Sequence, residues 1–333
     1  MSDNYLCNPD IIKNASLIIR NRNIVQISKI KQLSGPLFDY NVIKIIANYI
    51  WKLDNSIPDR HRDSIINSKS IRVMGEYPHE TLWLVSQKCS FKCLEVHSLY
   101  FTKDIIRYLT VDIEELCISS PIGDRHLHFA LNIRVLKILT GGLFLETVEF
   151  GSMPNLEVLE ITNTSLYRLT IKDMPKLHTA VICHNWDLAE LTFDNNLNLV
   201  NLNLTNNKLT SLELSALMLE TLDVSFNKLT SLDLPNAPIL ETLDAGFNKL
   251  EYLNISAPIL ETLDVSRNKL TSLELSAPIL ETLDVSSNKL TSLDLSNAPA
   301  INKILIGGNP WDVTGGTWNM TALIGMIADL DYY

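Results

Sequence analysis

The chain is 333 residues long, which is enough for two ordinary domains or for one long array of repeats. Hydrophobic residues make up 46% and charged residues 20%, a composition that excludes disordered chains, collagen-like chains and coiled coils. The 28 Lys and Arg residues against 38 Asp and Glu give a net charge of −10. This acidic balance argues against nucleic acid or an anionic membrane surface as the partner.

The five cysteines are odd in number and scattered along the chain, unlike the dense disulfide framework of a small secreted domain. This pattern favours a reducing compartment and thiols that form no disulfides. The N-terminal residues contain no apolar run behind a basic start, so no secretory signal is expected. No stretch is long enough to span a membrane. We therefore expect an intracellular, cytoplasmic protein.

Residues 1–110 do not follow the repeat described below, and we expect them to form a helical cap. The segment PLFDYNVIKIIANYIWKL predicts an amphipathic helix, with Asp39 as a candidate N-cap. Its apolar face holds Val42, Ile45, Ile46, Tyr49, Ile50 and Leu53. The segment HETLWLVSQKCSFKCLEV predicts a second helix over residues 79–96.

Residues 36–92 resemble an F-box in two short segments. Pro36 and Leu37 followed by Val42, Ile45, Ile46 and Tyr49 are similar to its opening, and residues 84–88 are similar to its later helix. The polar stretch 54–78 separates the two segments more widely than in the family. The resemblance implies that these six residues dock a Skp-type adaptor. The alternative is that the segment only caps the first coil, as every solenoid requires.

From Leu199 onward the chain restates the pattern LxxLxLxxNxLxxLxL. Its asparagines lie 20 or 21 residues apart: Asn207, Asn227, Asn248, Asn268, Asn288 and Asn309. The frame continues backwards with substitutions to Ile113, which gives about nine or ten coils over residues 111–311. Because the asparagine has no apolar role, we expect its amide to turn inward and bond the backbone of the bend.

This pattern resembles the leucine-rich repeat superfamily, in the short class known from bacterial and giant-virus proteins. A coil of this length that contains two LxxLxL runs has too few residues left for a helix. We therefore predict an α/β repeat solenoid dominated by short parallel β-strands, with inward leucines and the horseshoe or superhelical form of that superfamily. A small helical N-terminal cap and a short helix within residues 312–333 are expected to cover its ends.

Positions at which the near-identical copies differ are candidates for partner binding. The residue before each asparagine is Asn206, Phe226, Phe247, Arg267, Ser287 and Gly308, and Tyr252 replaces a recurrent serine. Exposed aromatic residues and arginine are typical of binding anchors. Asp223, Asp244, Asp264 and Asp284 recur at one strand position and form an acidic ladder that would steer a basic partner. The alternative is that these differences arose by random drift after duplication of the repeats, and that the aspartates only form a solvated polar face.

Motifs for catalysis are absent from the sequence: there is no phosphate loop, GxGxxG, GxSxG or HExxH. Cys89 and Cys93 lack a second Cys or His pair at finger-like spacing, so no metal or cofactor is expected. We interpret the protein as a non-catalytic protein-protein interaction scaffold that binds its partner on the repeat surface. The alternatives are an F-box-type substrate receptor of a Skp-containing ubiquitin ligase and, with less support, an enzyme of unrecognised class.

Overall fold

The computed structural model of the chain describes residues 70–75, 93–98, 113–119, 126–127, 133–139, 146–194, 198–214, 217–234 and 237–311. The chain divides into two compact units, Met1–Phe144 and Leu145–Tyr333. Every regular element in the described residues is a β-strand, so the predicted strand-dominated solenoid is confirmed there. The helices expected around residues 39–53 and within 312–333 lie outside the described residues.

Five strands of the first unit are described: β1 (Ser70–Gly75), β2 (Cys93–Ser98), β3 (Glu115–Ile118), β4 (His126–Leu127) and β5 (Val135–Ile138). Strands β1, β2, β3 and β5 pair in this order and run parallel. The register sets Ile71 beside Leu94, Leu94 beside Leu116, and Leu116 beside Leu136. Successive coils therefore stack the same apolar strand position.

The helix expected over residues 79–96 is wrong at its C-terminal end, because residues 93–96 belong to β2. The physical reason is the alternation of Leu94 and Val96, which pair with Leu116 and Ile118 of the next coil. Side chains repeat every two residues along a strand and about every 3.6 residues along a helix, so residues 93–96 cannot belong to both. The stacking of parallel strands therefore begins by residue 70, inside the region that the sequence had excluded from the repeat.

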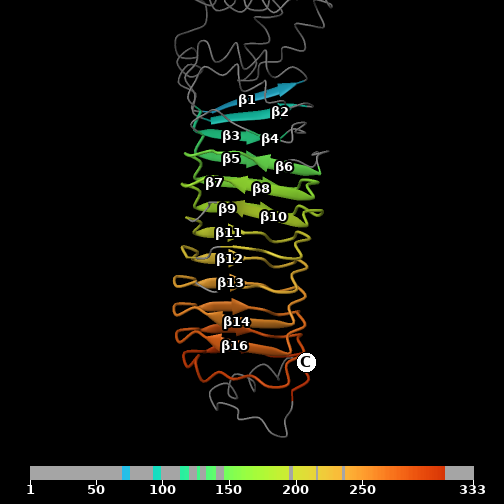
Figure 1. The fold of residues 1–333 in the computed structure, drawn as a ribbon, viewed down its shortest axis with the longest axis vertical. Helices are drawn as coiled ribbons and strands as arrows, with labels where there is room; N and C mark the ends of the chain where they lie inside the picture. The colour runs from blue at the N-terminus through green and yellow to red at the C-terminus, as the bar shows by residue number, and fades with distance from the viewer. Residues whose placement is uncertain are drawn as a thin grey trace, which may run out of the picture. The chain divides into compact units, whose positions relative to one another are not determined.

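The described residues of the second unit form thirteen strands in three parallel sheets. The largest sheet has the order β7 (Val158–Thr162), β9 (Thr179–Cys183), β11 (Asn201–Asn203), β12 (Thr221–Asp223), β13 (Thr242–Asp244), β15 (Thr262–Asp264), β17 (Thr282–Asp284), β18 (Lys303–Leu305). The second runs of the coils form β6 (Thr147–Phe150), β8 (Arg168–Lys172) and β10 (Glu190–Asp194), and later β14 (Tyr252–Ser256) and β16 (Ser272–Ser276). Figure 1 shows the coils of this unit stacked one upon the next.

The core of the second unit is a stack of inward leucines. In the recurrent Thr-Leu-Asp strands only the middle residue is fully buried. Leu243 has Leu222 on one side and Leu263 on the other in the pairing register. Each coil therefore buries its apolar residues against its neighbours, as expected for a solenoid.

The repeat asparagines cross-link neighbouring coils at the bend that follows each strand. Asn248 is representative: its Nδ2 donates to the carbonyl oxygens of Val224 (2.9 Å) and Ala245 (3.2 Å), and its Oδ1 accepts from the amide of Leu229 (2.9 Å). Two of these three partners, Val224 and Leu229, belong to the preceding coil. Asn227, Asn268, Asn288 and Asn309 make equivalent bonds. Asn207 donates in the same way to Ile182, but its Oδ1 accepts from the amide of Asn185 (3.0 Å). These amides satisfy backbone groups that water cannot reach.

The recurrent Ala-Pro step forms the turn into the next strand. The amide of Leu260 donates to the carbonyl of Ala257 (3.2 Å), and Leu280 bonds Ala277 in the same way (3.1 Å). Proline fits the second position of such a turn because its φ is already fixed. The turn places the following glutamate at the edge of the coil.

Candidate interaction surface

The residue before each repeat asparagine has a left-handed backbone conformation. The φ angles of the non-glycine residues before these asparagines lie between 51° and 57°: His184, Asn206, Phe226, Phe247, Arg267 and Ser287. Asn163 has the same conformation before Thr164, which stands where later copies have asparagine. Gly308 completes the column with φ 72°. The bend therefore demands this conformation in every copy, whichever residue occupies it.

Asparagine and glycine suit this conformation, whereas phenylalanine and arginine do not. The left-handed region brings Cβ close to the following carbonyl oxygen, at a cost of about 1 kcal/mol or more for an ordinary side chain. Asn206 and Gly308 show that the bend also accepts residues that adopt the left-handed conformation with less strain. In proteins, backbone strain that a different residue could have avoided is found mostly at functional sites.

The side chains of Phe226, Phe247 and Arg267 form a continuous stack across three coils, which we name the bend stack. The two phenyl rings lie 4.0 Å apart between centroids at 15° to one another, and the Arg267 guanidinium carbon lies 4.9 Å from the Phe247 centroid. The phenylalanine residues are 46% and 40% exposed. The bend stack therefore presents aromatic and cationic surface to solvent and adds nothing to the leucine core.

Backbone hydrogen bonds fix the spacing of the bend stack. The amide of Phe226 donates to the carbonyl of Gly246 (3.0 Å), that of Phe247 to Ser266 (2.9 Å), and that of Arg267 to Ser286 (2.9 Å). Each bend is thereby tied to the next. Because the backbone is held, the rings lose little further freedom when a partner docks on them.

The predicted aspartate ladder lies three residues before the bend in each coil. The register pairs Asp223 with Asp244, Asp244 with Asp264, and Asp264 with Asp284. The carboxylates are half-buried rather than fully solvated, and each accepts a hydrogen bond at Oδ1 from the amide two residues later, at 2.8 or 2.9 Å. This is an Asx turn, so the aspartates also shape the bend that carries the aromatic residues.

The carboxyl group of Asp244 has a raised pKa. Burial, followed by the charges of Asp223, Asp264 and Asp284, raises its pKa to about 6, although the bond from the Gly246 amide acts in the opposite direction. The hydroxyl of Ser225 donates a second hydrogen bond to Asp223 (2.6 Å). Gly246 occupies the equivalent serine position and has no such donor.

Tyr252 lies apart from the bend stack. It begins β14, in the sheet formed with β16, whereas Phe226 and Phe247 sit at the bends that follow β12 and β13. Its side chain is exposed, and a hydrogen bond with Glu274 raises the pKa of its phenol. The structure therefore brings together three of the four predicted anchor residues and places the fourth on the other run of the coil.

A second pair of aromatic side chains lies at an earlier bend, and it was not among the predicted binding residues. His184 is the left-handed residue before Asn185, and its ring centroid lies 6.1 Å from that of the exposed Trp186. Trp186 takes the place of the lysine that follows the asparagine in later copies. The sequence positions of His184 and Trp186, directly before and after Asn185, could have predicted this pair.

The remaining predictions concern the F-box-like residues, the cysteines, metal binding and membrane-spanning helices. Pro36, Leu37, Val42, Ile45, Ile46 and Tyr49, with Cys7 and Cys89, lie outside the described residues. Cys183 is buried, and burial raises the pKa of its thiol. Within the described ranges no group of His, Cys, Asp and Glu side chains could hold a metal ion, and no helix long and apolar enough to cross a membrane is present.

The comparisons with known proteins define the fold. No family model matches the sequence, and no curated protein matches it. The structure is similar to the leucine-rich repeat domain of APL1B, with a TM-score of 0.59 and 14% identity over 98% of this chain and 90% of that one. It is also similar to YopM, a leucine-rich effector protein from Yersinia pestis, with a TM-score of 0.52 and 20% identity over 81% and 87% of the two chains. The fold is therefore that of leucine-rich repeat proteins.

Proposed function

We propose that the protein is a non-catalytic interaction scaffold that binds a protein partner through the bend stack of Phe226, Phe247 and Arg267. The observation that carries this proposal is two stacked, exposed phenyl rings on strained backbone, at positions where sister copies use cheaper residues. Aromatic residues and arginine dominate the energetics of protein interfaces. The fold on which this surface lies is shared with the leucine-rich repeat domain of APL1B and with YopM, a leucine-rich effector protein.

The chemistry of the surface favours a basic partner with an apolar or aromatic anchor. The exposed surfaces of the Phe226 and Phe247 rings can contact an apolar side chain of the partner. The aspartates of the ladder lie beside the bends and attract positive charge: Asp223, Asp244, Asp264 and Asp284. Because these carboxylates are tied to the backbone, they would steer the approach of the partner more than they would close ion pairs with it. Neutralising them should therefore slow association and flatten its salt dependence.

The test uses a double variant, Phe226→Asn with Phe247→Asn, and asparagine is chosen because Asn206 already occupies the equivalent bend. A partner is first recovered by pull-down from native cells with the wild-type chain. The double variant should bind that partner at least tenfold more weakly, which follows from the loss of two anchors. Its melting temperature should be unchanged or slightly higher, because the strain is relieved.

The matched control is Tyr252→Asn, which removes an exposed aromatic side chain from the other run. It should leave the affinity within twofold of wild type. An unchanged dissociation constant for the double variant would show that the phenylalanines are drift, and the search would then move to His184 and Trp186.

The role of an F-box-type substrate receptor rests on the sequence resemblance alone, which covers residues 84–88 and the six residues Pro36, Leu37, Val42, Ile45, Ile46 and Tyr49. The same pull-down tests it, because recovery of a Skp-type adaptor that is lost on Ile45→Asp would support a ligase role. Recovery of other proteins alone would leave the plain scaffold. An intracellular, cytoplasmic location is part of both proposals.

A further inference from the structure

The coils of the second unit carry a column of glutamates along one edge. Glu220, Glu241, Glu261 and Glu281 occupy the same position immediately before strands β12, β13, β15 and β17, and all four are exposed. The amide of Glu241 donates to the carbonyl of Glu220 (2.9 Å), and the series continues through Glu261 (2.8 Å) and Glu281 (2.9 Å). We name this column the acidic edge. Its members are spaced by about 4.8 Å, the distance between neighbouring strands.

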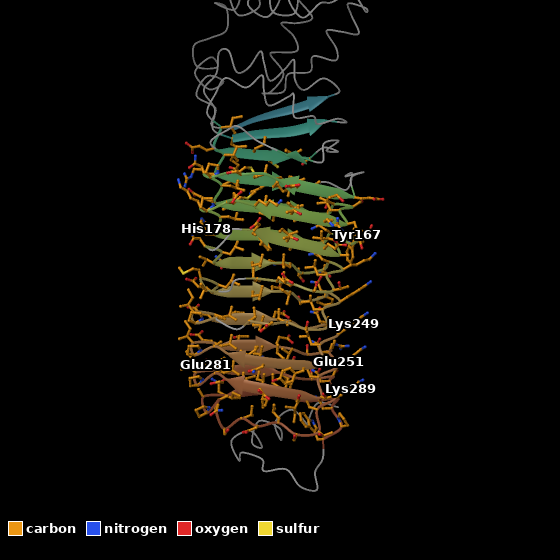
Figure 2. All side chains as sticks on the ribbon, viewed as in Figure 1. Tyr167, His178, Lys249, Glu251, Glu281 and Lys289 are labelled. Atoms are coloured by element: carbon orange, nitrogen blue, oxygen red, sulfur yellow. The ribbon has the colours of Figure 1, made fainter. Side chains whose placement is uncertain are left out.

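The opposite edge carries a column of lysines. Lys228, Lys249, Lys269 and Lys289 follow the repeat asparagines, and their amides donate to the preceding coil at 2.9 Å in each case. We name this column the basic edge. Figure 2 shows Lys249 and Lys289 along one side of the unit and Glu281 on the other. Glu251 also lies on the basic edge, so it lowers the positive charge there at one coil.

Neither edge is neutralised within the chain as far as it is described. None of these eight side chains forms an ion pair with another described residue, although Lys208, one coil earlier, pairs with Asp187 at 2.6 Å. Like charges instead stack upon like charges along both columns. Each edge therefore offers a periodic row of one sign to an external partner.

An apolar row adjoins the acidic edge. Leu217, Met218 and Ile279 are 48%, 45% and 42% exposed, and Ile239 and Ile259 are half-buried at the same repeat position as Met218 and Ile279. A partner that fits this edge has positive charges carried on apolar stems. Lysine has this form, because its four methylene groups cover apolar surface while the ammonium group reaches outward.

We propose that the occupant of the acidic edge is the basic edge of a second copy of this chain, with the two solenoids side by side and parallel. Both columns arise from the same coils, so they have the same spacing, and contact at one coil brings the others into register. The lysine stems then lie on the Met218–Ile279 row, and the ammonium groups face the glutamates. This proposal rests on other side chains than those of the bend stack, although Lys249 and Lys269 follow Phe247 and Arg267 by two residues.

The overall charge of −10 opposes association of two copies, but it does not decide the outcome at moderate salt. The Debye length is about 8 Å at 0.15 M salt, so repulsion between distant charges is screened while pairs in contact persist. Exposed ion pairs are individually weak. We therefore expect reversible, micromolar-range association that is lost at high salt. Because the two edges differ, the contact is heterologous and can continue to a third copy.

The experiment measures sedimentation velocity of the full chain over about 5 to 300 µM, a range suited to a small, polar interface. The acidic-edge variant combines Glu241→Lys, Glu261→Lys and Glu281→Lys. The basic-edge variant combines Lys249→Glu, Lys269→Glu and Lys289→Glu. The wild type should associate, each triple variant should be monomeric, and an equimolar mixture of the two should associate again, because their edges are complementary.

The control variant combines Glu213→Lys, Asp233→Lys and Glu274→Lys, exposed positions on the other run of the coils. Each replacement adds two charges, so this control and the acidic-edge variant share a net charge of −4 against −10 for the wild type. The control should associate at least as well as the wild type. Equal loss of association in the control would show an effect of net charge and overturn the proposal.

Zero-length carbodiimide cross-linking of the wild type provides a measurement that does not depend on variants. Lysines 249, 269 and 289 should be joined to glutamates 241, 261 and 281 in the dimer band, and mixed isotope labelling should show the links to be between chains. A wild type that stays monomeric over the whole concentration range, or a mixture of the two triple variants that does not associate, would overturn the proposal.

Discussion

The coils between residues 146 and 194 and those between 217 and 311 share one frame but arrange their charges in opposite ways. In the earlier coils, opposite charges meet across neighbouring coils: Lys172 pairs with Glu149 at 3.1 Å, and Arg168 pairs with Glu190. In the later coils, glutamate follows glutamate and lysine follows lysine, and no residue from 217 to 311 forms an ion pair with another residue that the structure describes.

The difference follows from how similar the copies are. A solenoid stacks equivalent positions, so identical copies bring identical side chains together. The later copies restate LETLD almost unchanged, whereas the earlier ones have diverged and can place a cation beside an anion. The later coils therefore depend more on the leucine core and the asparagine bonds. The variants below test that dependence, from the largest expected effect to the smallest.

Asn248→Ala should produce the largest loss of stability. It removes an inward amide whose Oδ1 accepts from Leu229 and whose Nδ2 donates to Val224, Ala245 and Gly246. Buried polar groups left without partners cost about 1 to 3 kcal/mol each, so the free energy of unfolding should fall by about 3 kcal/mol or more. Denaturant titration measures it. Asn254→Ala, at an exposed position of β14, is the control and should change stability by less than about 0.5 kcal/mol.

Asp244→Asn should stabilise the protein at neutral pH. The pKa of Asp244 in the fold is about 6, above the ordinary value of 3.8, so the folded state favours the protonated form. The resulting stability is complete below pH 4 and is lost as the pH rises through 6. Asparagine is neutral at every pH and can still accept from the Gly246 amide, as Asn203 does from Thr205. We expect a gain of about 1 kcal/mol at pH 7.5, discounted because the group is half exposed, and none at pH 4.

Asp294→Asn is the matched control for this pH dependence, with the opposite sign. Hydrogen bonds from the Ser296 amide and hydroxyl lower the pKa of Asp294. Its charged form therefore stabilises the fold above the unfolded pKa, and that stability is lost as the pH falls. Asp294→Asn should lower the melting temperature at pH 7.5 and have no effect in acid. A pH-independent difference for Asp244→Asn would contradict the assigned burial of this carboxylate.

Glu261→Lys should make the later coils resemble the earlier ones. It replaces an inner member of a like-charge column and sets an ammonium group beside both Glu241 and Glu281. Exposed pairs contribute about 0.2 to 1 kcal/mol, so dilute protein at low salt should gain about 0.5 kcal/mol. The gain should disappear in about 0.5 M salt, where screening is strong. Arg168→Glu is the reciprocal variant, and a gain in stability from it would refute the charge comparison.

Much of the second unit could be predicted from the sequence because its frame is set by a few residue types. The period of the asparagines indicated the coil length, and the leucine spacing indicated two extended runs. The strands β1 and β2 were missed because they carry Ile71, Val73, Leu94 and Val96 without the asparagine that marked the later copies. A periodicity search that required only the paired apolar residues would have reached them.

The candidate site was harder to predict because backbone conformation decides it. The sequence showed that Phe226 and Phe247 recur one residue before the asparagine, but not that this position is left-handed in every copy. The recurrence of the aspartates predicted an acidic ladder, but not the hydrogen bond that ties each carboxylate to the backbone. The Ser or Gly two residues after each one was a signal for the Asx turn that holds them.

Gly246→Ser should have the smallest effect and tests whether the ladder can be made uniform. Ser225 occupies the equivalent site and bonds Asp223 through its hydroxyl at 2.6 Å, so serine is compatible with the bend. A Cβ at residue 246 would lie 3.1 Å from Asp264 Oδ1 and 3.2 Å from Asp244 Oδ1, contacts with side-chain atoms that can move slightly. The new hydroxyl should donate to Asp244 and lower its pKa. With the smaller entropy of the unfolded chain, we expect a gain of about 0.5 kcal/mol at pH 7.5. NMR titration of the Asp244 carboxyl carbon checks the pKa directly. A loss of stability, with no fall in that pKa, would mean that the space beside Asp264 and Ser266 is already filled to its limit.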